Sequence, residues 1–138
     1  MKNNYYLVLS SCLFFVSIIY FICNFDNNNF KIFIALLLLL NIIILILFWK
    51  DAYYKSKVHK LDGLLGKISF ILGCCYVLLI KDKAKYYKII FIILVMITLL
   101  LFYKSDKISK KSWCSRNHIL THSSFHIFST ACTLFIFI

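Results

Sequence analysis

The chain has 138 residues, of which 62% are hydrophobic and only 15% are charged. Soluble domains contain about 45–50% apolar and about 25% charged residues, so this composition excludes a soluble globular domain, and its hydrophobicity excludes a disordered chain. The net charge is +11. A basic balance is also typical of nucleic-acid-binding proteins, but here the basic residues stand between apolar runs, where they contact anionic lipid headgroups. We expect the lipid bilayer and its anionic headgroups as partners, and no nucleic acid.

Five apolar segments are long enough, or nearly so, to cross a bilayer, which takes about 20 helical residues. In chain order they cover residues 5–23, 32–49, 64–80, 86–103 and 119–138. The runs are continuously apolar rather than alternating, which favours helices over the strands of a membrane barrel. The sequence therefore predicts an all-α, polytopic membrane helical bundle of about five transmembrane helices, folded as a single domain over residues 1–138.

The first segment has an alternative interpretation as a secretory signal, because Lys2 precedes an apolar run. Its 19 residues exceed the apolar region of a signal, which is about 7–15 residues long, so we expect a retained helix. Lys67 and Lys88 stand near the ends of the third and fourth segments, where a lysine reaches the headgroups. We expect both to lie near the headgroups or to face the bundle interior.

Lys and Arg residues divide unevenly between the two sides of a five-helix chain. One side receives eleven of them, and the other receives five, which are Lys31, Lys81, Lys83, Lys85 and Lys88. Because Lys and Arg accumulate on the cytoplasmic side, we expect the N-terminus on that side and the C-terminus on the opposite side. Trp49 and Trp113 fall at segment ends, and we expect them to anchor the chain at the membrane interface.

Three of the four histidines, His118, His122 and His126, recur at intervals of four residues. This spacing places them on one stripe of a helix, and polar residues of a membrane helix usually face the bundle interior. Two histidines four residues apart can bind one metal ion, with a third ligand from another helix or from His118. The stripe is also compatible with helix packing, in which each imidazole hydrogen-bonds across a helix interface.

A second polar cluster, Ser56, His59 and Asp62, precedes the third segment at intervals of three residues. With five spans, this cluster and the start of the last helix lie on the same, basic side of the membrane. The fourth histidine and a carboxylate can therefore meet the histidine stripe. The alternative is a solvated loop in which Asp62 is the N-cap of the third helix.

The run from Thr121 to His126, Thr-His-Ser-Ser-Phe-His, resembles the last-helix motif of a membrane hydrolase superfamily. That superfamily comprises alkaline ceramidases, progestin and adiponectin receptors and haemolysin III-like proteins. His59 and Asp62 of the second cluster also resemble the His and Asp that the superfamily has near its second and third helices. The resemblance implies a zinc-dependent hydrolase of lipid amides or esters. It implies zinc ligands at His59, His122 and His126 (with His118 in reserve) and catalytic roles for Asp62, Ser56 and Ser123.

A different class of function remains open beside the hydrolase. The chain can equally be a non-enzymatic membrane protein, or an accessory subunit of a membrane complex, in which the histidine stripe packs helices together. Convergence of the imidazoles of His59, His122 and His126 on one point would favour a metal site. Imidazoles spread along helix contacts would favour packing.

Overall fold

The computed structural model describes residues 4–50, 54 and 56–138. Its elements in chain order are α1 (Asn4–Ser11), α2 (Phe14–Cys23), α3 (Asn29–Lys50), α4 (Lys57–Cys75), the π-helix η1 (Tyr76–Ile80), α5 (Lys85–Lys111) and α6 (Arg116–Phe137). α1 and α2 together make one span, and η1 completes the span begun by α4, so the described residues form five helices long and apolar enough to cross a membrane. The expected all-α bundle is confirmed.

α4 and α5 extend furthest beyond the apolar runs that predicted the helices. α4 begins at Lys57 rather than near Leu64, because the Ser56 side chain caps it by accepting a hydrogen bond from the His59 backbone N–H at 3.1 Å. Asp62 therefore lies inside the helix, and the alternative that makes it the N-cap is wrong. Lys67 lies about 15 Å from the start of α4, deeper in the span than the sequence suggested. α5 likewise extends beyond Tyr103 to Lys111.

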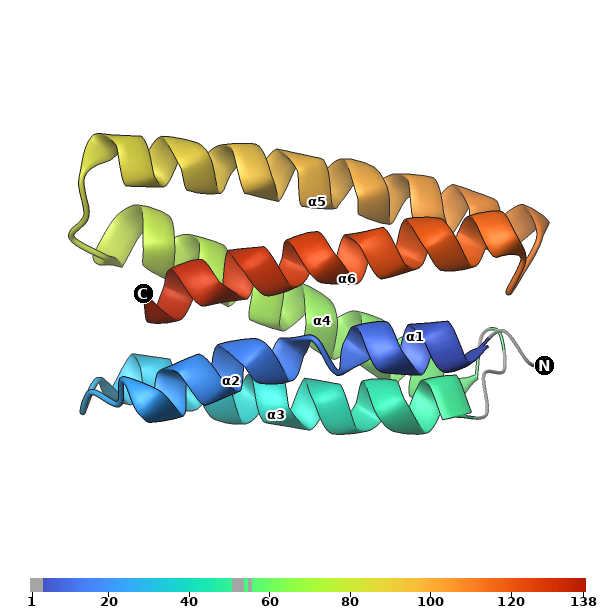
Figure 1. Ribbon diagram of the computed structural model, residues 1–138, viewed down its shortest axis with the longest axis horizontal. Coiled ribbons are helices and arrows are strands. Elements are labelled where there is room, and N and C mark those ends of the chain that lie inside the picture. Colours follow the sequence, from blue (N-terminus) through green and yellow to red (C-terminus); the bar gives the residue numbers. More distant parts are fainter. Residues whose placement is uncertain (1–3, 51–53, 55) are drawn as a thin grey trace.

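α6 occupies the centre of the bundle, where it packs against α5, α1 and α2 (Figure 1). α3 packs against α1, α2 and α4 on the other side. α4 thus packs mainly on α3, and α5 packs mainly on α6, so these two helices form the open edges of the bundle. The first residues of α1 and the last residues of α6 lie at opposite ends of the molecule (Figure 1), as an odd number of spans requires.

Large apolar side chains cover the outside of the bundle, as expected of helices that face lipid. Exposed Leu, Ile, Phe and Tyr side chains occur on every span, while the core is formed by a smaller set that includes Ile34, Leu38, Ile42, Val77 and Phe91. Conversely, several serine, threonine and histidine side chains are buried between helices. This distribution is the reverse of a soluble fold and fits a bilayer as solvent.

Lysines hold helix ends at the pole of the bundle where α6 ends. The Lys81 ammonium donates to the carbonyls of Phe135 and Ile136 at 2.8 and 3.0 Å, and the Lys31 ammonium donates to that of Phe137 at 3.3 Å. These cations satisfy orphan carbonyls and complement the negative end of the α6 dipole. Burial is the largest cause that lowers the pKa of Lys81, to about 8, and the nearby charges of Lys31 and Lys83 lower it further.

Lys88 makes a similar contact at the end of the preceding span. Its ammonium donates to the carbonyl of Leu78 at 3.0 Å, so it faces a neighbouring helix terminus rather than lipid. This agrees with the expected placement of Lys88. At the other pole, Lys2 and Lys55, two of the eleven basic residues expected on the cytoplasmic side, lie outside the described residues.

A candidate site: the histidine-lined cavity

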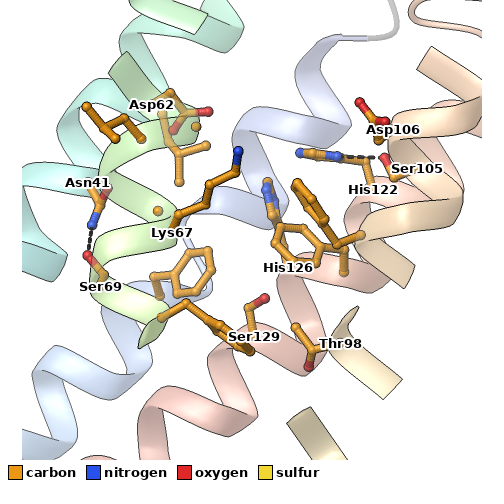
Figure 2. Close-up of a pocket in the computed structure, with 18 of the residues that line it drawn as sticks. Asn41, Asp62, Lys67, Ser69, Thr98, Ser105, Asp106, His122, His126 and Ser129 are labelled. Carbon is orange, nitrogen blue, oxygen red and sulfur yellow. Dashed lines mark hydrogen bonds between the residues drawn. The ribbon is translucent and has the colours of Figure 1, made fainter. Parts of the chain in front are cut away.

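A cavity of about 720 Å³ lies between α4 on one side and α5 and α6 on the other, with α3 completing its wall (Figure 2). Its volume falls within the range of about 300–1,000 Å³ typical of small-molecule sites. Most of the wall is apolar, with Leu38, Leu45, Phe70, Phe91, Leu99 and Phe102 among its residues. The polar residues that it exposes come from four helices and include Asn41, Asp62, Lys67, His122, His126 and Ser129.

Two histidines of α6 hydrogen-bond to serines of two different helices. The Nδ1 atom of His126 lies 2.8 Å from Oγ of Ser10 on α1, and Nδ1 of His122 lies 2.8 Å from Oγ of Ser105 on α5. Both serines are buried. The histidine stripe therefore joins α6 to the helices on either side of it, and among the described residues the Nε2 atoms of these two rings have no hydrogen-bond partner.

The other two histidines lie in an aromatic cluster at the basic end of the cavity. The ring of His59 stacks on Phe48, with centroids 4.8 Å apart, and His118 packs on Trp113 at 4.9 Å and accepts a hydrogen bond from the Cys114 backbone N–H. Trp49 stacks on Trp113 and is only 1% exposed. The expectation of Trp49 as an interfacial anchor is therefore wrong, because its indole is used in packing between helices.

Lys67 is the deepest charged side chain of the cavity. It lies eight residues beyond His59, about 12 Å further along α4, and Figure 2 shows its ammonium extended toward His122 and His126. Lys67 thus lines the cavity but is an exposed residue, and the expectation that it avoids lipid stays a prediction. A charge near the bilayer centre costs about 2.5–3.5 kcal/mol on insertion scales, so this position calls for a polar surrounding.

Three buried polar atoms in the cavity wall lack a partner within the part of the chain that the structure describes, and one of them is Nε1 of Trp49. Asn41 donates through its amide to Ser69 Oγ on α4, but its Oδ1 atom accepts nothing, and the Ser129 hydroxyl on α6 is likewise unpaired. The two residues are 5% and 6% exposed. Leaving such a group unsatisfied costs about 1–3 kcal/mol, so the cavity offers hydrogen-bonding capacity that the protein itself does not use.

The residues expected to form a catalytic site are only partly brought together. Asp62, His59, His122 and His126 all line the cavity. Ser56 instead serves as the α4 cap. Ser123 lines a separate groove between α1 and α6, together with Tyr6 and Arg116. The structure thus places neither serine in the cavity wall.

The residues of the cavity fit a zinc ion in part. Metal-binding imidazoles usually donate their second N–H to a nearby group, and the serine contacts of His122 and His126 have this form. Nevertheless, no group of three His, Cys, Asp or Glu side chains able to hold a metal ion occurs among residues 4–50, 54 and 56–138. Two candidate ligands are present without a third beside them, and zinc binding stays a prediction.

No protein-family model, curated protein or solved structure matches the chain. The similarity to the membrane hydrolase superfamily rests on the run from Thr121 to His126 and on His59 and Asp62. The geometry of the cavity is therefore the main ground for a functional argument.

Proposed function

We propose that the chain is a multi-pass membrane protein that binds an amphiphilic, lipid-like molecule in the cavity between α4 and α5. The observation that carries this proposal is a set of three buried atoms, Asn41 Oδ1, Trp49 Nε1 and Ser129 Oγ, that lack a partner among the described residues in an otherwise largely apolar wall. An acyl chain matches the apolar wall, and a polar head matches the unsatisfied groups.

The cavity volume of about 720 Å³ lies within the range of about 300–1,000 Å³ typical of small-molecule sites and suits a single-chain amphiphile. The open edge between α4 and α5 gives a lipid-like molecule a lateral path from the bilayer, because these two helices pack mainly on other neighbours.

In this proposal the histidine stripe is structural. Through Ser10 and Ser105, His126 and His122 fix α6 to α1 and α5, and so hold one wall of the cavity in place. The function is then non-enzymatic, and the excess of Lys and Arg at the basic end supports a cytoplasmic location for that end and for the start of α1.

Tryptophan quenching by a brominated single-chain amphiphile tests the proposal. Both tryptophans of the chain line the cavity, so occupancy should give a saturable quenching component in purified protein. The variant Gly66→Phe should abolish that component, because no atom lies within 4 Å of a Cβ added at Gly66, which lines the cavity. Leu61→Phe, on the exposed face of the same helix, should retain it. Quenching that never saturates, or that persists in Gly66→Phe, would contradict ligand binding in this cavity.

A zinc-dependent lipid hydrolase is the second candidate, favoured by one specific observation. His122 and His126 are both oriented through Nδ1 and keep Nε2 free of protein partners among the described residues. Zinc bound there would polarise a scissile carbonyl and lower the pKa of its bound water to about 7, and Asp62 of the same cavity would act as the base. Metal analysis of the purified protein tests this candidate. Zinc should be lost in His122→Ala/His126→Ala and kept in Ser124→Ala, whose hydroxyl bonds only to Leu120 O of its own helix.

A further inference from the structure

The charges around the cavity indicate what kind of polar head the bound molecule carries. Three lysines and two aspartates line it, and they are Lys60, Lys67, Lys110, Asp62 and Asp106. Lys110 and Asp106 form an ion pair at 2.6 Å. Within the part of the chain that the structure describes, neither Lys60 nor Lys67 takes part in an ion pair.

Lys67 differs from Lys60 in its depth. Lys60 lies in the first turn of α4, where its ammonium can remain in the headgroup layer. Lys67 lies two turns further into the span, and its side chain extends into the cavity and toward the end of α4 that carries Asp62 (Figure 2). Asp62 lines the same cavity but forms no ion pair with Lys67.

The surroundings of the Lys67 ammonium are suited to an anion. His122 and His126 lie across the cavity from it (Figure 2). Further along the span, away from the start of α4, the cavity wall is formed by apolar residues such as Phe70, Phe91 and Ile136. A head at Lys67 therefore leaves its chain in the apolar part of the cavity. An ionised head bound away from bulk water needs an opposite charge, and Lys67 supplies it.

We infer that Lys67 holds the anionic head of a single-chain amphiphile, a carboxylate or a phosphate, inside the cavity. This inference rests on the proposed function and names the chemical class of its ligand. The carboxylate or phosphate oxygens accept hydrogen bonds from the ammonium, and the acyl chain lies against the apolar wall toward Phe91. No bond is made or broken in this step.

A headgroup series with one common acyl chain tests the inference by equilibrium binding to purified protein in neutral detergent. The four probes are the fatty acid, the lysophosphatidate, the fatty alcohol and the alkylamine. Both anions should bind the parent at least about tenfold more tightly than the alcohol or the amine, the loss expected for removing a hydrogen bond to a charged group. The tighter of the two anions identifies whether carboxylate or phosphate is preferred.

Variants separate the role of Lys67 from a general effect of positive charge. Lys67→Gln should reduce the affinity of both anions about tenfold or more and leave that of the alcohol unchanged, whereas Lys67→Arg should restore anion binding. Lys57→Gln, an exposed lysine of the same helix outside the cavity, should bind all four probes as the parent does. Any of three results would overturn this inference without contradicting the proposed function. They are equal affinity for the alcohol and the anions, tighter binding of the amine than of the anions, and an anion affinity that is unchanged in Lys67→Gln. Absence of binding by all four probes would contradict the proposed function itself.

Discussion

His126 on α6 and Ser10 on α1 lie 2.8 Å apart, Nδ1 to Oγ, although 116 positions separate them in the sequence. The Ser10 hydroxyl also lies 3.0 Å from the carbonyl of Leu7, so it can donate to that carbonyl and accept from the imidazole, or donate to the imidazole itself. One hydrogen bond thus joins the first helix to the last.

A double-mutant cycle on Ser10→Ala and His126→Ala should detect this contact. We expect each single variant to lower the free energy of unfolding by about 1–3 kcal/mol, the cost of leaving a buried partner unsatisfied. The coupling energy should lie near 0.6–1.7 kcal/mol, as for hydrogen bonds between membrane helices. Denaturation in mixed micelles measures both. A second cycle, with Ser124→Ala in place of Ser10→Ala, is the control and should give no coupling energy. A coupling energy of zero in the Ser10 cycle would show that the helices do not need this hydrogen bond.

Two glycines of α4, one at its middle and one near its end, should respond oppositely to added volume. A Cβ at Gly73 would lie 2.6 Å from Cδ1 of Ile136 on α6, whereas a Cβ at Gly66 would have no neighbour within 4 Å. Gly73→Leu should therefore destabilise the fold by about 1–3 kcal/mol through overpacking. Gly66→Ala should be neutral or stabilise it by up to about 1 kcal/mol through helix propensity. Thermal unfolding of both variants in one detergent checks the contrast, and equal destabilisation would mean that α4 packs uniformly along its length.

Lys81 should make stability depend on pH above neutrality. Its pKa is about 8 in the folded chain, against an ordinary value of 10.5, chiefly because of burial. Between these values the unfolded chain binds more protons than the folded one, so stability should rise as the pH increases from about 8 to 10.5. The neutral amine still has N–H groups for Phe135 O and Ile136 O.

The variant Lys81→Met isolates this effect. The melting temperature of the parent minus that of the variant should increase from about pH 8 to pH 10.5 and stay constant below pH 7. Lys104→Met, an exposed lysine near the other end of α5, should show no such window. A constant difference between the parent and Lys81→Met from pH 7 to pH 10.5 would mean that the Lys81 ammonium has an ordinary pKa.

The five spans predict that the two ends of the chain lie on opposite sides of the membrane. Reporter domains that are active on only one side, fused before Met1 or after Ile138, should report the first fusion as cytoplasmic and the second as translocated. The charge bias toward the basic end sets this direction. Activity of both fusions on the same side would require an even number of spans.

The bundle could be predicted from the sequence because continuous apolar runs leave few other choices in lipid. The ends of α4 and α5 could not, because the polar residues 57–63 and 104–111 continue the helices beyond their apolar parts. Asn41 and Lys67 were visible as isolated polar residues of apolar spans, but their shared cavity depends on how α3 and α4 pack. Ser10 and Ser105 carried no signal, since serines are common in membrane helices and only the fold brings them to the histidines.

The central claim is that an amphiphile occupies the cavity between α4 and α5, and photolabelling tests it most directly. A single-chain anionic amphiphile with a diazirine near the end of its chain should label inward residues such as Phe91, Phe70 and Thr98 at substoichiometric ligand. Unlabelled amphiphile should compete for these sites, and Gly66→Phe should lose them. Labelling confined to outward residues such as Ile93 and Leu100, which are 53% and 65% exposed, and unaffected by competition, would contradict the account.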